Sequence, residues 1–354
     1  LRNLLQARLR GLTQSHQGSA RVGRAIELAS GVANAQALLA TWFLGSETGH
    51  ALADILFGKV DPSAKLPVSF PWESGQEPFF YDRKSTGRPT VDNGSTDGSR
   101  EYLASQPDVS LWHSTGSYKR SRFGMDWMNF LLAKHGHGHW TLCVDPDEFF
   151  VYPFCDTRPL RALTDWLDAS SIKSFSAMLL DMYPKGPIDS RPYAEGQDPL
   201  EITQYFDSGN YTVSRNRRFG NLWIQGGPRA RLFFADIPER APALNKVPLV
   251  RWDRSYAYVS STHMLLPRGL NQVYDEWGGE KASGVLLHAK FLDTFAHKAE
   301  EEMQRKQHYA NSHEYRAYRL AIAKQPDLWC KWSEKYINWR QLEILGLMSK
   351  GNWA

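Results

Sequence analysis

The stretch TGRPTVDNGSTDGSREYL, residues 86–103, decides how the chain is organised. Its first residues close a segment rich in Pro and Gly, and from Val91 an apolar position is followed by Asp, Asn, Gly, Ser and Thr. Those residue types favour a tight turn, and REYLASQ continues from it as a helix. The stretch also raises a question: one protein with one function, or two fragments joined at Thr90.

The residues after this turn alternate between strand and helix patterns. DVSLWH (108–113) alternates as a strand, and FGMDWMNFLLAKHG (123–136) places its aromatic residues on one helical face. HWTLCVDPDEFFVYP (139–153) predicts a buried strand that ends in an acidic cluster. This alternation predicts an open α/β sheet. Ligands of such sheets bind beyond the carboxyl ends of the strands, where both acidic turns fall.

The acidic cluster has the pattern Asp-x-Asp, with Asp145 and Asp147 two residues apart. Two carboxylates at this spacing can share one hard divalent cation, so we expect Mn²⁺ or Mg²⁺ as cofactor. The cation would neutralise a diphosphate leaving group. Acidic residues in a loop are more often solvated or cap a helix. The preceding apolar strand and the turn at Asp92, 53 residues earlier (145 − 92 = 53), favour the metal site.

VDNGSTDGS and VDPDEFFVYP together resemble the GT-A glycosyltransferases of family 2. The resemblance implies a Rossmann-like mixed sheet with flanking helices. It also implies a metal-dependent hexosyltransferase that moves a sugar from a nucleotide-diphosphate donor, a UDP-sugar by preference, to an acceptor hydroxyl. The family's first strand and helix, which normally precede the turn, are missing. The resemblance places five acidic or amide side chains at the donor and its metal: Asp92, Asn93, Asp97, Asp145 and Asp147.

A later segment, SGVLLHAKF (283–291), matches the family's His-x-Lys position. A neutral His288 could complete the coordination shell of the metal or contact the diphosphate, and Lys290 could neutralise a phosphate charge. Alternatively, His288 is a structural histidine at a strand end, with its hydrogen bonds made inside the protein. The run His-Gly-His-Gly-His at 135–139 has the composition of a metal tract, but its position favours a polar turn.

Two further groups complete the candidate site. In GNLWIQGGPRARLFF (220–234), Arg229 and Arg231 could clamp a phosphate or a sugar carboxylate; a hairpin with solvated arginines explains them equally well. An inverting transferase needs a carboxylate base, and Asp275 and Glu276 lie in the right part of the chain. An exposed loop is the commoner situation for such carboxylates.

The segment before the turn has a different resemblance. WFLGSETGHALADILFGKVDPSAKLPVSFPWESGQEPFFYDRKSTGRP resembles the C-terminal α/β domain of glycoside hydrolase family 3, from about residue 33 to 89. Glycoside hydrolysis uses two carboxylates. The family places its nucleophile on a preceding barrel and its acid/base upstream, while Glu47 falls in the structural GxExG turn. We therefore expect no hydrolysis from this segment alone.

These resemblances predict a chimera of four parts. The main interpretation is a glycosyltransferase, impaired by its missing first strand. The alternatives are a β-glucosidase-type hydrolase fragment and a catalytically inactive chimeric protein. The parts are a poorly ordered 1–32, a hydrolase-domain fragment 33–90, a GT-A-like domain 91–310 and C-terminal helices 311–354.

The composition limits which kinds of partner and which compartment we expect for the protein. A net charge of +4, from 42 basic and 38 acidic residues, is too weak to predict nucleic-acid binding. Three cysteines without a CxxC pair argue against a disulfide framework. No apolar run of about 18 residues predicts a transmembrane span, and no secretory signal pattern opens the sequence. We expect a cytoplasmic protein, with a peripheral membrane association left open.

Overall fold

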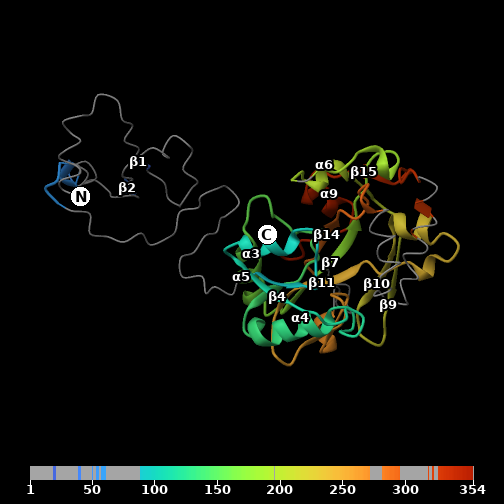
Figure 1. The fold of residues 1–354 in the computed structure, drawn as a ribbon, viewed down its shortest axis with the longest axis horizontal. Coiled ribbons are helices and arrows are strands. Elements are labelled where there is room, and N and C mark those ends of the chain that lie inside the picture. Colours follow the sequence, from blue (N-terminus) through green and yellow to red (C-terminus); the bar gives the residue numbers. More distant parts are fainter. Residues whose placement is uncertain are drawn as a thin grey trace. The chain divides into compact units, whose positions relative to one another are not determined.

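The structure is a computed structural model, and the chain divides into two compact units, Leu1–Ser85 and Thr86–Ala354 (Figure 1). The structure describes a few residues of the first unit and most of the second. The described residues are 19–20, 39–40, 50, 53–55, 57–60, 88–194, 196–271, 281–295, 318, 321–322 and 326–353.

In the first unit, strands β1 (Ser19–Ala20) and β2 (Leu39–Ala40) pair in parallel. Helical residues 53–55 follow, where the sequence spacing predicts a helix. The turn at residues 57–58 contains Gly58, whose φ of 71° is the left-handed conformation that glycine adopts without strain. Lys59 then contacts Asp54 at 3.0 Å. Glu47 lies outside the described residues.

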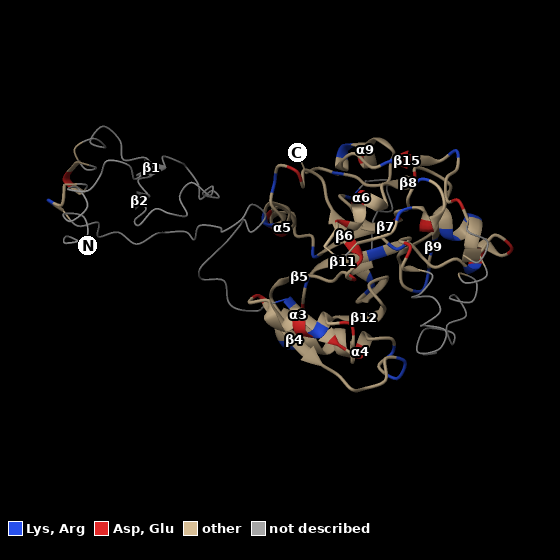
Figure 2. Ribbon diagram, turned by 45° about the horizontal axis from the view of Figure 1, so that its top comes forward, with Lys and Arg blue, Asp and Glu red and all other residues tan. Residues whose placement is uncertain are grey.

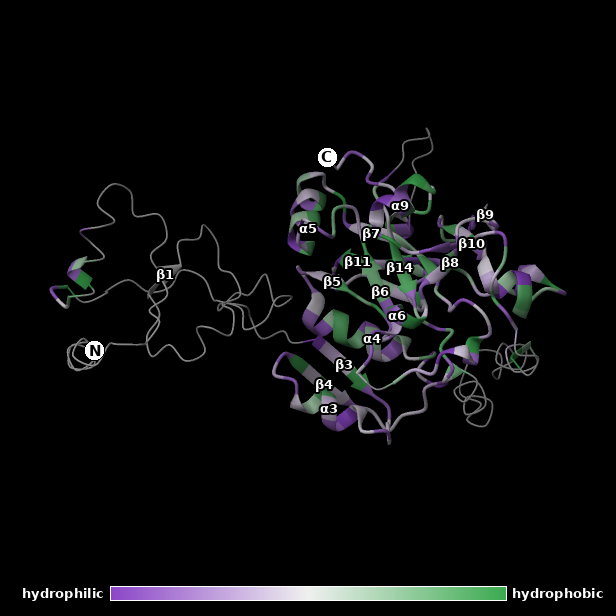
Figure 3. Cartoon of the chain, turned by 90° about the horizontal axis from the view of Figure 1, so that it is seen from above, coloured by the Kyte–Doolittle hydropathy of each residue, from purple (hydrophilic) through white to green (hydrophobic). Residues whose placement is uncertain are grey.

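The second unit is built on a five-stranded mixed sheet, so the α/β prediction is confirmed. Strands β7 and β14 at its centre run parallel, and the other neighbouring pairs are antiparallel. The central strands are strongly apolar (Figure 3). In sheet order the strands are β5 (Trp140–Leu142), β11 (Asn245–Arg251), β7 (Ser174–Asp181), β14 (Gly284–His288) and β6 (Glu148–Val151).

A separate parallel pair carries the opening turn. Strand β3 (Arg88–Asp92) pairs with β4 (Val109–His113), and helix α3 (Ser99–Ser105) connects them. The strand, turn and helix predicted from the opening stretch are all present. The Arg88 N–H donates to Asp108 and the Asp92 carbonyl accepts from Ser114, so these residues face β4. Because orientation alternates along a strand, the backbone groups of Pro89 and Val91 face the opposite edge.

Smaller elements surround the sheet. Strands β9 and β10 form a hairpin at the periphery of this unit, on the opposite side from α5 (Figures 1 and 3). The helices are α4 (Met125–Leu131), η3 (Leu132–Gly136), α5 (Leu160–Ala169), η4 (Ile188–Ser190), α6 (Pro199–Ile202), η5 (Arg229–Phe233), η6 (Pro238–Arg240), η7 (Arg268–Asn271) and α9 (Trp339–Ile344). The remaining strands are β8 (Tyr205–Asp207), β9 (Tyr211–Arg215), β10 (Leu222–Gly226), β12 (Ala257–Ser260), β13 (Met264–Leu266) and β15 (Ser333–Lys335).

The C-terminal stretch meets the helical expectation in part. Residues 318, 321–322 and α9 are helical, whereas residues 333–335 form strand β15, which pairs antiparallel with β8. The end of the chain also contributes to the core, because Trp353 is 5% exposed and packs against Tyr152 and Trp166. Long-range pairing decides the structure here in place of local helical spacing.

Candidate functional site

The opening turn is organised around the buried carboxylate of Asp92 at the carboxyl end of β3. The carboxylate accepts hydrogen bonds from the backbone N–H of Ser95 at 2.9 Å and of Gly94 at 3.3 Å. Nδ1 of His113, at the end of the neighbouring strand, lies 2.8 Å away. The hydrogen bonds from Ser95, with that from His113, hold the pKa of Asp92 well below its usual range. Asp92 is therefore ionised and fixed by its own turn.

Asn93 and Asp97, the other polar residues of the turn, also make local contacts. Nδ2 of Asn93 donates to the carbonyl oxygens of Ser114 at 2.8 Å and Gly116 at 2.9 Å. A carboxylate oxygen of Asp97 accepts from the N–H of Ser99 at 3.1 Å, and hydrogen bonds from Ser99 lower its pKa. Asn93 thus ties the β3 turn to the loop after β4, and Asp97 stabilises the start of α3.

The second acidic turn lies beside a buried ion pair. Lys246 of β11 places its Nζ 2.9 Å from Glu148 and 3.5 Å from Asp145. The side chains of Lys246 and Glu148 are 4% and 1% exposed, whereas that of Asp145 is 62% exposed. Burial raises the pKa of Glu148, and the ammonium of Lys246 opposes that shift. Figure 2 shows basic and acidic residues beside one another near β7 and β11.

Next to this pair, His288 lies between two carboxylates. The parallel register of β14 with β7 sets His288 opposite Asp181, and its Nδ1 is 2.8 Å from Oδ1 of that residue. Its Nε2 is 3.4 Å from Oδ2 of Asp147. The structure thus brings together two of the three predicted metal ligands, Asp147 and His288, whereas the third, Asp145, contacts Lys246.

Arg229 completes this group, and its position is compatible with either neutral tautomer of the His288 imidazole. Its Nη2 lies 2.6 Å from Oδ1 of Asp181 and 2.9 Å from Nδ1 of His288. If Nδ1 carries the proton, it donates to Asp181, and Nε2 turns a lone pair toward Asp147. If Nδ1 accepts from Arg229, Nε2 carries the proton and donates to Asp147. Burial would raise the pKa of Asp181, but Arg229 and His288 hold it well below its usual range.

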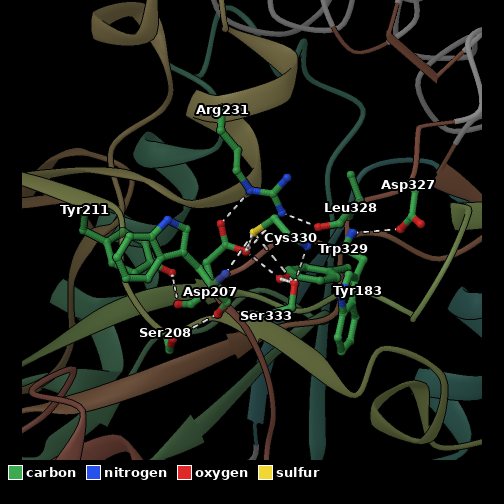
Figure 4. Close-up of polar contacts among 11 residues, drawn as sticks. Tyr183, Asp207, Ser208, Tyr211, Arg231, Asp327, Leu328, Trp329, Cys330 and Ser333 are labelled. Atoms are coloured by element: carbon green, nitrogen blue, oxygen red, sulfur yellow. Dashed lines mark hydrogen bonds and ion pairs between the residues drawn. The ribbon is translucent and has the colours of Figure 1, made fainter.

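Arg231 belongs to a different cluster, centred on Asp207 (Figure 4). Its guanidinium donates to both carboxylate oxygens of Asp207, at 2.8 and 3.1 Å, and to the carbonyl of Leu328. The Tyr183 hydroxyl donates to the same carboxylate at 2.5 Å and lies 2.8 Å from the Ser333 hydroxyl. This cluster joins β8 and η5 to the segment before β15, so Arg231 has a structural partner.

Two further predicted groups make contacts of their own. Lys290 is over the rings of Phe295 and Tyr318, at 5.5 and 4.9 Å from their centroids. His137 of the histidine run pairs with Asp253 at 3.3 Å, as a polar turn would. The candidate bases Asp275 and Glu276 lie outside the described residues.

Sequence reasoning missed three charged residues: Asp181, Lys246 and Asp207. Asp181 ends the apolar run of β7, the pattern that singled out Asp145, and this signal was available. Lys246 sits in β11, an apolar strand in which it is the one buried charge, and a buried charge needs a partner. Nothing near Asp207 distinguishes it from an ordinary acidic residue.

Comparison with known proteins places the first part of the chain. The model of the glycosyl hydrolase family 3 C-terminal domain matches residues 19–105. The periplasmic β-glucosidase of Salmonella typhimurium is 51% identical over 67 residues, which are 19% of this chain and 9% of that enzyme. The probable β-glucosidase J of Neosartorya fischeri is 45% identical over 77 residues, 21% of this chain and 9% of its own length. No solved structure matches.

These matches correct the functional expectation. The glycosyltransferase interpretation is wrong, because the matched proteins are β-glucosidases. For the same reason, the expectation that a hydrolase is less favoured than a transferase is also wrong. No match shows a GT-A segment. The structure adds no support to the predicted metal site, since no group of three or more His, Cys, Asp or Glu able to hold a metal occurs within the described part of the chain. The same part contains no helix long and apolar enough to cross a membrane.

Proposed function

We propose that the chain carries a functional part of a β-glucosidase-type glycoside hydrolase. Residues 19–105 would have the role that the matched segment has in such an enzyme's C-terminal domain. The observation that carries the proposal is the 51% identity with the Salmonella typhimurium periplasmic β-glucosidase over 67 residues. That match includes only 9% of the enzyme's length, so the activity of the whole enzyme is part of the proposal.

The chemistry of glycoside hydrolysis limits what this segment contributes. Cleavage uses two carboxyl groups on either side of the bond, about 5–5.5 Å apart in retaining enzymes. The proposal assigns neither to residues 19–105. The segment is instead a structural part of a domain that a complete enzyme needs for its active site.

A segment exchange tests the proposal. Residues 19–105 of this chain replace the matched segment of the Salmonella typhimurium enzyme, and hydrolysis of 4-nitrophenyl β-glucoside is measured. We expect kcat/KM to stay within about tenfold, a change of ~1.4 kcal/mol in transition-state stabilisation. The control is the same exchange with Gly58→Val, which forces a β-branched side chain into the left-handed backbone of Gly58 and should lower the melting temperature.

Two outcomes would decide against the proposal or extend it. An exchanged enzyme that folds with an unchanged melting temperature but has lost hydrolysis contradicts it and favours the inactive chimera. The intact chain is assayed in parallel. Hydrolysis by the intact chain would assign catalytic carboxylates within this sequence.

Three sequence-based expectations have not been tested. They are a GT-A arrangement of residues 91–310, binding of Mn²⁺ or Mg²⁺, and binding of a UDP-sugar. They stay predictions, and the proposed function depends on none of them.

A further inference from the structure

Two acid-free stretches of sequence meet at one corner of the second unit. Residues 208–235 and 254–274 contain no Asp or Glu, while together they hold seven arginines. Arg229 and Arg231 are neutralised by the buried carboxylates Asp181 and Asp207. Arg217 and Arg218 lie in the turn of the β9–β10 hairpin and Arg268 at the start of η7, and no described carboxylate forms an ion pair with them.

Hydrogen bonds hold these three arginines in one place. Nη2 of Arg268 donates to the carbonyl of Arg217 at 2.6 Å. Nδ2 of Asn271 donates to the carbonyl of Phe219 at 3.0 Å, and the N–H of Arg218 donates to Oδ1 of Asn216 at 3.1 Å. Because hydrogen bonds join the hairpin turn to η7, the arginines of both elements are close together before a ligand binds. That lowers the entropic cost of binding.

The three side chains are exposed and available. Arg217, Arg218 and Arg268 are all exposed, and within the described residues none of them forms an ion pair with a carboxylate. The guanidinium of Arg218 lies 5.4 Å from the ring of Phe219, which leaves its edge for a ligand. Each guanidinium can donate two parallel hydrogen bonds to a phosphate, so the corner matches a surface that presents several phosphates.

Exposed apolar side chains near these arginines in the sequence indicate which polyanion fits. Leu266, two residues before Arg268, is 41% exposed, and Val213 on β9 is 60% exposed. Exposed aliphatic groups beside cations gain little from the groove of a nucleic acid. At a bilayer surface they enter the interface while the cations stay at the level of the headgroups.

We propose that this arginine corner, defined as Arg217, Arg218 and Arg268 with Leu266, binds the phosphate headgroups of an anionic lipid bilayer. Its attraction is electrostatic over about a Debye length, roughly 8 Å at physiological ionic strength. The contact is peripheral and reversible, and its residues lie outside the segment 19–105 of the proposed function.

Co-sedimentation with vesicles tests this proposal on the intact chain. Vesicles of phosphatidylglycerol and phosphatidylcholine should bind the chain in a salt-sensitive manner, and vesicles of phosphatidylcholine alone should bind it weakly. Each basic residue near an anionic surface contributes a factor of about five in partitioning. R217S/R218S should therefore weaken binding about 25-fold, and R217S/R218S/R268S roughly 100-fold.

Matched controls separate this corner from net charge and from misfolding. The triple variant R100S/R120S/R191S removes the same charge from exposed arginines outside the corner and should weaken binding less than about threefold, because screening limits the reach of those charges. The double variant keeps the hydrogen bond that Arg268 donates to the Arg217 carbonyl, so it tests binding with this tie intact.

Three results would overturn the proposal. The first is an equal loss in both triple variants, which would leave only an effect of net charge. The second is release of the chain by millimolar inorganic phosphate, which would assign the corner to free phosphate. The third is tighter binding to a single-stranded oligonucleotide than to the vesicles, which would assign it to nucleic acid.

Discussion

Among single residues, Asp207 has the clearest structural role. Its side chain is 0% exposed, and it accepts hydrogen bonds from Arg231 and Tyr183 (Figure 4). Removing one partner of a buried pair leaves the other charge uncompensated in a medium of low polarity. We therefore expect Asp207→Asn to lower the free energy of unfolding by about 3–5 kcal/mol in urea titrations.

A surface pair supplies the matched control for this substitution. Arg122 and Asp126 also form an Arg–Asp pair, but their side chains are 62% and 47% exposed. Asp126→Asn should therefore cost less than about 1 kcal/mol. Equal losses for the two variants would contradict the role given to the Asp207 cluster.

Asp181 gives the fold a dependence on acid pH. Its folded-state pKa lies below the usual unfolded value of about 3.9, so its ionised form stabilises the fold above that value. This contribution is present at neutral pH and is lost as the pH falls below about 4. Asp181→Asn should lower stability at pH 7 and flatten the acid limb of the curve of unfolding free energy against pH.

Asp165 is the comparison for that experiment. It is 68% exposed and faces Arg161 at 3.6 Å, so Asp165→Asn should leave the acid limb unchanged. If both variants show the steep acid limb of the parent, carboxylates other than Asp181 cause the acid sensitivity.

At the scale of elements, the central strand β14 requires a glycine at its start. A Cβ on Gly284 would lie 2.6 Å from the carbonyl oxygen of Val151 and 2.9 Å from the ring of Phe175. Forcing atoms into such a packed site costs about 1–3 kcal/mol. Gly284→Ala should lower the melting temperature, while Gly269→Ala, whose Cβ meets nothing within 4 Å, should change it little. Similar shifts for both would mean that β14 can move to accept the methyl group.

Local signals in the sequence predicted some elements well and others poorly. The turn at Asp92 with helix α3, strand β4 and helix α4 follow from residue types within a few positions. Strand β15 does not, since its residues are extended only because β8 offers a partner. His288 and Asp147, predicted as ligands of one metal, lie 3.4 Å apart, whereas Asp181 was missed because its contact with His288 depends on strand register.

At the scale of the whole molecule, the core closes with residues near the end of the chain. Trp353 packs against the rings of Tyr152, Phe154 and Trp166, and the Arg158 guanidinium lies 5.3 Å from its ring. We expect Trp353→Ala to cost about 3–5 kcal/mol, measured by urea unfolding. Trp329→Ala, at a side chain that is 40% exposed, should cost much less. A small loss for Trp353→Ala would show that the core forms without the final residues.

The function of the whole chain was less predictable than its fold. The family 3 match ends at residue 105, beyond the boundary between the compact units at Ser85, so it includes the turn at Asp92. Short acidic motifs at strand ends suggested transferase chemistry. In the structure these acidic residues contact their own turns or buried basic residues. The longer resemblance to glycoside hydrolase family 3 is the one that a family model matches.

The parallel pair β3–β4 has a consequence for solubility. An unpaired strand edge can template association with other chains, and proline is one of the residues that prevents it. Among the described residues β3 pairs with β4 alone. On its other edge Pro89 has no N–H, which leaves Val91 as the one outward donor of the strand Arg88–Asp92. Pro89→Thr should accelerate aggregation, followed by light scattering, without lowering the melting temperature. We therefore expect Pro89 to keep this edge of β3 from recruiting the strands of other chains into fibres.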